Sequence, residues 1–212
     1  VQAVTEEVML KLARSAAAEP GLKPLCLAGG VALNCVANGK LLRDGCFENI
    51  WIQPAAGDAG GALGVALSAY HGFLGKPRGR SDGRDRMRGS YLGPAYEQQD
   101  IETRLADVGA VFEVMDDDAL LAACAHDLAE GHALGWFQGR MEFGPRALGG
   151  RSILGDARSP AMQSVLNLKV KFRESFRPFA PSVLREDVAD WVEIAQDSPY
   201  MLLVAGVKAS RR

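Results

Sequence analysis

PLCLAGGVALN at residues 24–34 and IWIQPAAGDAGGALG at residues 50–64 are two versions of one local pattern. Each opens with a short apolar run that predicts a buried strand. Each run ends at a glycine-rich turn, followed by helical spacing to about Arg43 in the first copy and about Tyr70 in the second. A strand–turn–helix unit that occurs twice predicts an α/β fold.

The rest of the chain divides into regions of different character. Residues 1–72 hold both repeated units, preceded by an amphipathic helix over residues 1–18, and are expected to form a first domain. Residues 73–90 (FLGKPRGRSDGRDRMRGS) are rich in glycine and arginine and lack apolar periodicity. They predict a solvated linker, with phosphate binding by the arginines as the alternative. Residues 91–212 are expected to form a second α/β domain.

Apolar spacing predicts the elements of this second domain. Its last predicted element is a strand-like run at Met201–Val204. Because the chain ends soon after this run and begins on Val1 directly before the first helix, it is predicted to be a fragment of a longer protein. The other predicted elements are helices at about 100–108, 118–130, 162–170 and 187–195 and a buried strand at 133–137.

Composition excludes several classes of protein. The 212 residues are 48% hydrophobic and carry a formal net charge of −2, which gives no reason to expect a nucleic-acid or membrane partner. The four cysteines show neither CxxC spacing nor a Cys/His cluster, which argues against a zinc site. They predict buried or half-buried thiols in a reducing compartment. No apolar run reaches ~18 residues, so a cytoplasmic location is expected.

Positive charge is concentrated in the segment Gly139–Pro181 and just beyond it. Between residues 140 and 185, nine basic residues face three acidic ones, which is a local net charge of +6 within a chain of −2. Arginine dominates, and its planar guanidinium binds phosphate or carboxylate through two parallel hydrogen bonds. The nine basic residues are Arg140, Arg146, Arg151, Arg158, Lys169, Lys171, Arg173, Arg177 and Arg185.

The same segment carries residues that shape its backbone. Lys169, Lys171 and Arg173 alternate, so in an extended chain they would share one face, where a bound anion would relieve their repulsion. An anion pocket is the favoured interpretation, while a nucleic-acid surface and a network of structural ion pairs stay open. Glycine turns alternate with phenylalanines that are expected to bury and anchor the segment, namely Phe143, Phe172, Phe176 and Phe179.

The two glycine turns near the start of the chain have a binding interpretation as well. Gly29 and Gly30 would let a ligand approach the backbone, and the N–H groups of the following helix favour phosphate oxygens. In the second turn, Asp58 stands just before a helix, where an N-cap role competes with metal ligation. Because both turns lie in one small domain, each strengthens the case that the other binds a nucleotide.

Four sequence blocks carry a resemblance to a known family. The chain resembles the NodU/CmcH-type O-carbamoyltransferases, which modify nodulation factors and antibiotics, from about Leu25 to Val204. The resemblance implies the end of an actin-like ATPase-fold domain, similar to threonylcarbamoyladenosine synthase, followed by a YrdC-like α/β domain, both incomplete. The blocks, in the family's order and at similar intervals, are LAGGVALN (27–34), IQPAAGDAGGALGVAL (52–67), EFGPRALGGRSIL (142–154) and VKFRESFRPFAP (170–181).

The chemistry that this resemblance implies uses ATP, carbamoyl phosphate and a divalent, iron-type metal. The YrdC-like part would form carbamoyl-adenylate, and the actin-like part would transfer the carbamoyl group to an acceptor hydroxyl with loss of AMP. Such chemistry chiefly requires that anions be positioned and their developing charge neutralised. The family's paired metal-binding histidines have no counterpart in the spacing of His71, His126 and His132, so the remaining metal ligands are expected outside this chain.

The resemblance and the charge pattern together assign roles to individual residues. Asp58 matches the metal-ligating aspartate of the family. Charge assigns Arg146, Arg151 and Lys171 to the reacting groups. The nucleotide and carbamoyl phosphate are expected to contact Gly29, Gly30, Val31, Asn34, Arg140, Lys169, Arg173 and Arg177.

Other functions of the same or a different class stay open. The nearest is a hydrogenase-maturation or threonylcarbamoyl-transferring enzyme with the same two domains, although the zinc-finger cysteines of the maturation enzymes are not seen in this sequence. An RNA-binding module would use the basic residues 140–185, and its affinity would fall steeply with salt. A third is a catalytically inactive homologue that binds nucleotide.

Overall fold

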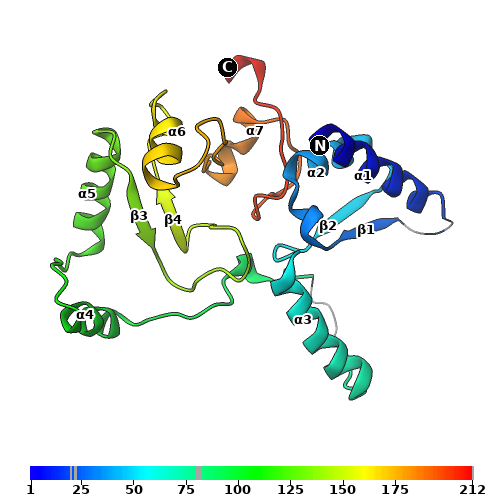
Figure 1. Cartoon of the computed structure of the whole chain (residues 1–212), viewed down its shortest axis with the longest axis horizontal. Helices are drawn as coiled ribbons and strands as arrows, with labels where there is room; N and C mark the ends of the chain where they lie inside the picture. Colours follow the sequence, from blue (N-terminus) through cyan, green and yellow to red (C-terminus); the bar gives the residue numbers. More distant parts are fainter. Residues whose placement is uncertain (20, 22, 80–82, 212) are drawn as a thin grey trace. The chain divides into compact units, whose positions relative to one another are not determined.

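The computed structural model describes residues 1–19, 21, 23–79 and 83–211. They form two compact units, each built around a two-stranded sheet (Figure 1). Unit 1 comprises Val1–Leu92, Glu142–Leu148 and Val183–Arg212, and unit 2 comprises Gly93–Met141 and Gly149–Ser182. Two later segments therefore belong to the same compact unit as the N-terminal residues. The domain boundaries at residues 72 and 90 stay predictions.

The sheet of unit 1 is formed by the two repeated sequence patterns. Strands β1 (Pro24–Leu27) and β2 (Asn49–Ile52) pair in parallel, with Leu25 opposite Ile50. Parallel neighbours need a crossover connection, which is supplied by the helix between them. The pairing confirms the mixed α/β class and the first two predicted strands.

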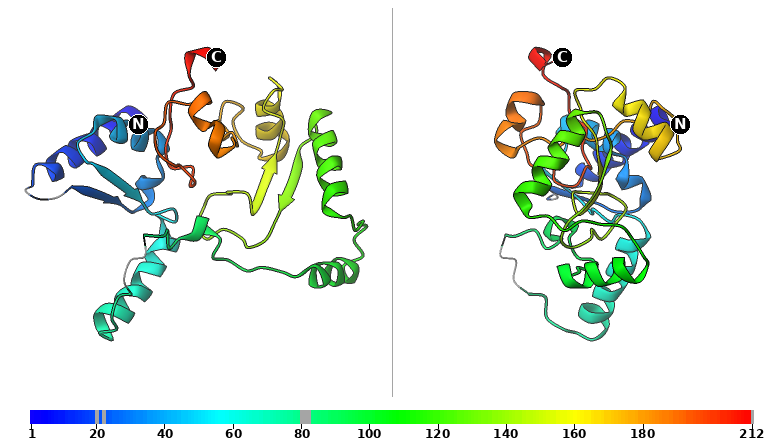
Figure 2. Two further views of the ribbon diagram at one scale, coloured as in Figure 1. Left: turned by 180° about the vertical axis from the view of Figure 1, so that it is seen from behind. Right: turned by 90° about the vertical axis from the view of Figure 1, so that its left-hand side faces the viewer.

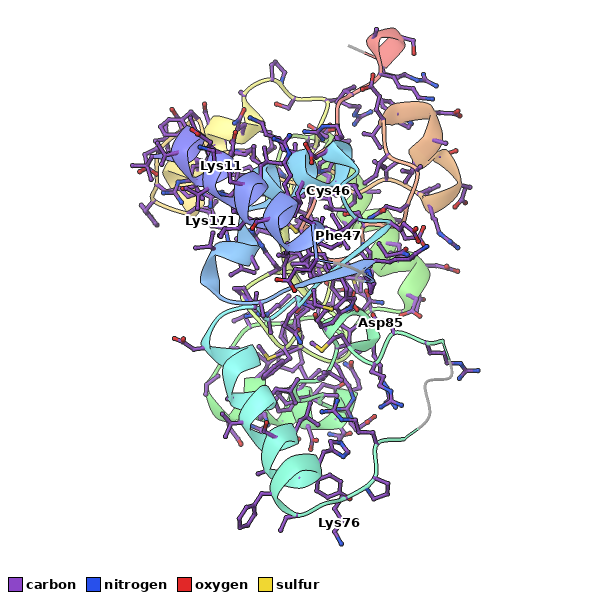
Figure 3. The ribbon with its side chains drawn as sticks, turned by 90° about the vertical axis from the view of Figure 1, so that its right-hand side faces the viewer. Lys11, Cys46, Phe47, Lys76, Asp85 and Lys171 are labelled. Carbon is purple, nitrogen blue, oxygen red and sulfur yellow. The ribbon has the colours of Figure 1, made fainter. Side chains whose placement is uncertain are left out.

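Two helices, α1 (Gln2–Ala17) and α2 (Cys35–Asp44), cover one face of this sheet (Figures 1 and 2). Ala13, Leu41 and Phe47 form the buried cluster between the helices and the strands (Phe47 is labelled in Figure 3). The predicted helix at 31–43 is divided, because Asn34 has ψ 87° and cannot continue a helix. A 3-10 turn, η1 (Gly30–Leu33), precedes it, and α2 follows it.

Helix α3 (Asp58–Ser68) extends away from the sheet and continues into a π-helical turn, η2 (Ala69–Phe73) (Figure 2). None of its residues is buried within unit 1, although most are apolar. Gly60 stands where the helix passes the preceding turn, and any Cβ there would overlap the carbonyl group of Ala55. The close approach at this position therefore requires glycine.

The C-terminal part of unit 1 completes a second apolar core. Leu202 is buried in a cluster with Ala32, Ile52 and Ala56, which lie in or beside the two glycine turns. The prediction of a strand over residues 201–204 is wrong: Met201 has φ +53°, and within the described chain this segment bonds instead to α2, through Val204 N to Cys35 O at 3.2 Å. Short helical elements precede it, η5 (Arg185–Asp187) and α7 (Val188–Trp191), and η6 (Ala209–Arg211) follows.

Apart from a 3-10 turn of unit 1, η3 (Arg88–Ser90), the remaining elements lie in unit 2, mostly as the sequence predicts. Its strands β3 (Leu134–Phe137) and β4 (Arg151–Leu154) pair antiparallel, with α5 (Asp117–Ala129) beside β3 in Figure 1. Helix α4 (Gln98–Asp107) has no buried residue. The predicted helix at 162–170 is a short α6 (Met162–Val165) that changes to a π-helical turn, η4 (Leu166–Val170). In unit 1, the predicted helix at 187–195 is reduced to α7, since Val192 is already extended.

No helix in the described part of the chain combines the length and the apolar character that a membrane crossing requires.

Candidate functional site

Both glycine turns lie at one edge of the unit 1 sheet. Because β1 and β2 are parallel, the turns that follow them emerge from the same, carboxyl, edge. A hydrogen bond joins them directly, from Gly29 N to Ala56 O at 2.8 Å. Ligands of open parallel sheets bind at this edge, in the crevice beyond the strand ends. We call the two turns, residues 28–34 and 53–58, the glycine-turn edge.

The first turn presents its backbone to the outside. Gly29 has φ +94°, a conformation that residues with a side chain rarely adopt. At neither Gly29 nor Gly30 would a Cβ meet any atom within 4 Å, and Val31 beside them is 59% exposed. The turn is therefore open to a ligand, in keeping with its predicted contact with a nucleotide.

Asn34 already has a structural role at this edge. Its Oδ1 accepts from Ala37 N at 3.1 Å and so caps α2. The same oxygen accepts from Gln2 Nε2 at 3.1 Å, while Asn34 Nδ2 donates to Gln2 Oε1 at 2.9 Å. A nucleotide that contacts the Asn34 side chain would have to share or replace the bonds to Gln2.

Asp58 lies on the surface of the second turn. It is the first residue of α3, and Gly57 rather than Asp58 occupies the N-cap position, so the N-cap alternative is wrong. The carboxylate is exposed and close to the helix N-terminus, where negative charge is favourable. Among the described residues, no three His, Cys, Asp or Glu side chains gather as a metal-binding group. Asp58 could therefore be one ligand of a metal but not the whole set.

The loop Glu142–Leu148 packs against both turns. Arg146 Nη2 donates to the carbonyl oxygen of Leu33 at 2.8 Å, and a Cβ at Gly144 would lie 3.2 Å from that of Ala55. The loop is closed on itself by Glu142, which is 5% exposed and whose Oε1 accepts from Leu148 N at 2.6 Å. This block of sequence thus belongs to the glycine-turn edge.

Arg146 is half-buried at this edge. Its Nε is buried and has no hydrogen-bond partner in the described part of the chain. The hydrogen bond from Arg146 Nη2 to Leu33 goes to a neutral carbonyl. An anion beside Arg146 would give the buried Nε the hydrogen-bond partner that the Leu33 carbonyl does not supply.

The remaining predicted residues lie in unit 2. The segment Gly139–Pro181, predicted as one anion centre, is thus divided between two compact units. Arg140 and Arg151 lie at one end of the β3–β4 pair, where Arg140 Nη1 donates to Gly93 O at 2.9 Å and Arg151 is opposite Phe137. The others, Lys169, Lys171, Arg173 and Arg177, follow α6.

The loop of residues 171–177 is organised by a buried amide. Asn167 has no exposed surface, and its Nδ2 donates to the carbonyl oxygens of Ser175 (3.0 Å) and Arg177 (2.8 Å). Its Oδ1 accepts from Arg173 Nε at 2.6 Å. The Arg173 guanidinium also lies over the ring of Phe179, 4.9 Å from its centroid. We call residues 171–177 the basic loop.

Acidic neighbours neutralise part of the positive charge. Arg177 pairs with Glu174 at 2.8 Å, and Arg158 pairs with Asp156 at 2.8 Å. The pKa of Glu174 is lowered, first by its own backbone N–H and then by Arg177. Structural ion pairs, one of the open alternatives, are therefore present. Lys169 and Lys171 are exposed and have no acidic partner in the described ranges (Lys171 is labelled in Figure 3).

Two expectations about this segment are wrong. Lys169 and Lys171 do not alternate along an extended strand, because Leu166–Val170 is a helical turn stabilised by the bond from Lys171 N to Leu166 O. Phe172 and Phe176 are 84% and 76% exposed, so they do not anchor the segment within this unit. Asn167 anchors the segment instead, and the pattern of polar residues in the sequence did not predict this role.

Asn38 is a further buried polar residue that sequence reasoning missed. It has no exposed surface and lies on α2 within unit 1. The signal available in the sequence was a polar residue on the apolar side of a predicted helix, one turn after Asn34. In a sequence, one polar residue of that kind is compatible both with a buried hydrogen-bonding role and with an exposed position.

Comparison with known proteins places the chain in a family. The sequence model described as "Carbamoyltransferase N-terminus" matches residues 1–67, and the one described as "Carbamoyltransferase C-terminus" matches residues 125–212. The chain belongs to the carbamoyltransferase family. This confirms the resemblance drawn from the four sequence blocks, and it places the glycine-turn edge and the basic loop in a family of transferases.

Relatives of this carbamoyltransferase chain match it over nearly all of its length. An uncharacterized protein of Synechocystis is 60% identical over 100% of this chain and 35% of its own length. Nodulation protein NolNO of Sinorhizobium fredii is 43% identical over 100% of this chain and 31% of its own. The 3'-hydroxymethylcephem-O-carbamoyltransferase of Streptomyces clavuligerus is 35% identical over 97% and 37%. The chain thus spans only 31–37% of the length of these three relatives.

Proposed function

We propose that this chain is part of an ATP-dependent O-carbamoyltransferase that acts on a hydroxyl group of a small molecule or glycan. The observation that carries the proposal is the match of one chain to both the N-terminal and the C-terminal models of the family. A relative that is 35% identical is named as an O-carbamoyltransferase, which supports a hydroxyl acceptor.

The proposed reaction has two steps. In the first, carbamoyl phosphate, ATP and water give carbamoyl-adenylate, pyrophosphate and inorganic phosphate. In the second, the hydroxyl oxygen of the acceptor attacks the carbamoyl carbon, the bond to the AMP phosphate oxygen breaks, and the hydroxyl proton is lost. Both steps exchange anionic leaving groups, so the protein must chiefly hold anions in place and neutralise their charge.

In unit 1, the glycine-turn edge is proposed to hold the nucleotide. The open backbone at Gly30 and Val31 offers N–H groups without obstructing side chains, while Gly29, whose N–H is bonded to Ala56 O, would let the ligand approach closely because it has no side chain. Arg146, whose buried Nε has no protein partner in the described chain, would supply positive charge toward a phosphate. Asn34 would position the turn through its cap of α2, and would contact the nucleotide by sharing or replacing its bonds to Gln2.

Asp58 is proposed as one ligand of a divalent metal at the same edge. An exposed carboxylate oxygen at a ligand-binding edge has suitable chemistry for a hard or intermediate cation. When bound, such a metal would act as a Lewis acid that lowers the pKa of the acceptor hydroxyl or polarises the carbamoyl oxygen. The other ligands of this metal are proposed to lie outside this chain, as the family resemblance implies.

In unit 2, the basic loop and its neighbours are proposed to hold carbamoyl phosphate and the ATP phosphates. Lys169 and Lys171 are exposed cations without acidic partners among the described residues, so they are available to an anion. Arg173 is oriented by Asn167 and by the Phe179 ring. Arg177 would have to exchange Glu174 for a ligand. Arg140 and Arg151 would contribute from the end of the β3–β4 pair.

The test uses the full-length protein that contains this chain. Pyrophosphate, phosphate and AMP are measured with ATP alone, with carbamoyl phosphate alone, and with both. Pyrophosphate release that requires carbamoyl phosphate is expected. Release of pyrophosphate or ADP at the same rate without carbamoyl phosphate would refute the proposal.

Two substitutions test the assignment of residues. Arg146→Ala and Lys171→Ala are each expected to lower carbamoyl-phosphate-dependent turnover by about 100-fold while the fold is retained, in line with loss of one charge-stabilising group. Lys76→Ala is the matched control, because Lys76 is an exposed lysine beyond α3 (Figure 3). Unchanged turnover in Arg146→Ala or Lys171→Ala would remove that residue from the site.

A further inference from the structure

The first glycine turn is held on its buried side by one amide, the side chain of Asn38. Asn38 Nδ2 donates to the carbonyl oxygen of Ala32, within η1, at 2.8 Å and to that of Leu202 at 3.0 Å. Asn38 has no exposed surface, so neither bond competes with water. Both acceptors lie in irregular backbone, one in the turn and the other in the C-terminal segment of unit 1.

The orientation of this amide is determined by its partners. Two carbonyl oxygens can be satisfied only by two N–H donors, so the NH₂ group must face Ala32 and Leu202. The opposite atom, Oδ1, is buried and has no hydrogen-bond partner in the described chain. An unpaired buried oxygen lowers the stability of the folded state. The two hydrogen bonds donated by Nδ2 of the same amide offset this cost.

The C-terminal segment is itself locked to α2. Val204 N donates to Cys35 O at 3.2 Å, and Arg43 Nη1 donates to Val204 O at 2.9 Å. Cys35, Asn38 and Arg43 thus share the face of α2 along which this segment runs. Leu202 fills the core below the turns together with Ala32 and Ala56. The Asn38 amide connects this fixed platform to the glycine turn.

We propose that Asn38 is a positioning residue that sets the conformation of the Gly30–Leu33 turn for nucleotide binding. This inference rests on the proposed nucleotide site at the glycine-turn edge. Asn38 does not contact the ligand. It holds the Ala32 carbonyl from the inner side, while Arg146 holds the neighbouring Leu33 carbonyl from the loop Glu142–Leu148. Two adjacent peptide groups of the turn are therefore fixed by side chains, one from the following helix and one from a loop 113 residues further along the chain.

The inference predicts a loss of affinity that is separate from a loss of stability. Asn38→Asp keeps the shape of the side chain but removes both N–H donors and places carboxylate oxygens against two carbonyls. When the binding-competent form of the turn is populated one time in ten, affinity falls about tenfold. Leu41→Ala is the control, since Leu41 is a buried core residue of the same helix that packs toward α1 and not toward the turn.

The experiment measures binding of AMP to the full-length protein by titration calorimetry, with thermal unfolding of each variant recorded alongside. We expect Asn38→Asp, and Asn38→Ala as a second variant, to weaken AMP binding about tenfold. We expect Leu41→Ala to lower the unfolding temperature while changing AMP affinity by less than about twofold. To separate any nucleotide bound at the basic loop, the same comparison is repeated in a Lys171→Ala background, where the effect of Asn38 is expected to persist.

Several outcomes would overturn the proposal. These are unchanged AMP affinity in the Asn38 variants, an equal loss of affinity in Leu41→Ala, absence of AMP binding to the unsubstituted protein, and failure of both Asn38 variants to fold while Leu41→Ala folds. The last result would make Asn38 a general determinant of stability. AMP binding that depends on Asn38, in a protein without carbamoyl-phosphate-dependent pyrophosphate release, would instead refute the proposed function and leave the positioning role standing.

Discussion

Gly39 is the residue on which the close packing of α2 against the C-terminal segment depends. A Cβ at this position would lie closer than 3.0 Å to the carbonyl oxygen of Val204 and 3.2 Å from its nitrogen. The carbonyl is backbone, fixed by Arg43 Nη1 at 2.9 Å, so it cannot turn aside as a side chain could. Replacement of Gly39 by alanine must therefore move the whole segment Leu202–Val204 by about 1 Å to restore an ordinary van der Waals separation.

Opposing effects decide the sign of Gly39→Ala. Alanine is favoured over glycine inside a helix by about 1 kcal/mol. Against this, displacement of the segment weakens the bonds from Val204 N to Cys35 O and from Arg43 to Val204 O, each worth about 1 kcal/mol. Overpacking of a tight contact costs about 1–3 kcal/mol more. The expected result is a net loss of about 2 kcal/mol in the free energy of unfolding.

Gly61→Ala provides a control with the opposite expected sign. Gly61 also lies within a helix, α3, but a Cβ there would meet no atom within 4 Å. Only the helix preference remains, so the substitution is expected to raise the free energy of unfolding by as much as about 1 kcal/mol. Both variants are compared with the unsubstituted full-length protein by urea unfolding, and amide exchange at Val204 is followed by mass spectrometry.

The expected pattern is a lower urea midpoint and faster exchange at Val204 for Gly39→Ala, with neither change for Gly61→Ala. A Gly39→Ala protein as stable as the unsubstituted one would refute the reasoning, because it would mean that the contact with Val204 is not close. A rise in the stability of both variants would refute it as well, since helix preference would then outweigh packing at Gly39. A fall in both would also refute it, since Gly61→Ala has no close contact to account for a loss.

Three further predictions concern single groups. The pKa of Asp156 is lowered chiefly by hydrogen bonds from Arg158, so its contribution to stability is present above the ordinary pKa of aspartate and fades as the pH falls through the lowered value. Arg158→Ala should flatten the acid limb of a stability–pH curve, and an unchanged limb would contradict this. The pKa of Cys46 is raised chiefly by burial, so iodoacetamide should modify it more slowly than the exposed Cys26; mass spectrometry that finds Cys46 modified first would refute it. Asn167→Ala removes the three side-chain bonds that hold the basic loop and should cost about 1–3 kcal/mol of stability with faster exchange at residues 171–177, whereas an unaltered exchange pattern would show that the amide does not organise the loop.

Local sequence patterns were sufficient for most of the secondary structure. The two strand–turn–helix units were recognised because apolar runs, glycines and helical spacing are properties of contiguous residues. The predictions failed where distant contacts outweighed local preference. Met201–Val204 has the composition of a strand, yet in the described chain its backbone bonds to α2, and Leu202 fills the core beneath the glycine turns. The spacing of apolar residues along the chain does not show which distant segment Met201–Val204 packs against.

The candidate site shows the same division. Glycine content and charge identified the turns at Gly29 and Asp58 and the arginine-rich blocks, since these are matters of residue type. Charge density could not reveal that Arg146 belongs with the glycine-turn edge while Lys171 lies in the other compact unit. Nor could it reveal that two of the phenylalanines expected to anchor the basic segment, Phe172 and Phe176, are exposed while Asn167 anchors the loop.

The order of amino acids was thus enough to establish the α/β class, the two glycine turns, the basic segment and, through four blocks, the family. The three-dimensional fold alone assigned partners: Arg146 to Leu33, Asn38 to Ala32 and Leu202, and Asn167 to the carbonyls of the basic loop. The physical reason is the separation along the sequence over which each kind of interaction acts. Strand and helix preferences act between residues a few positions apart, whereas a buried amide gains its energy from whichever carbonyl the folded chain brings within 3 Å, and for Asn38 one of those carbonyls is 164 residues away.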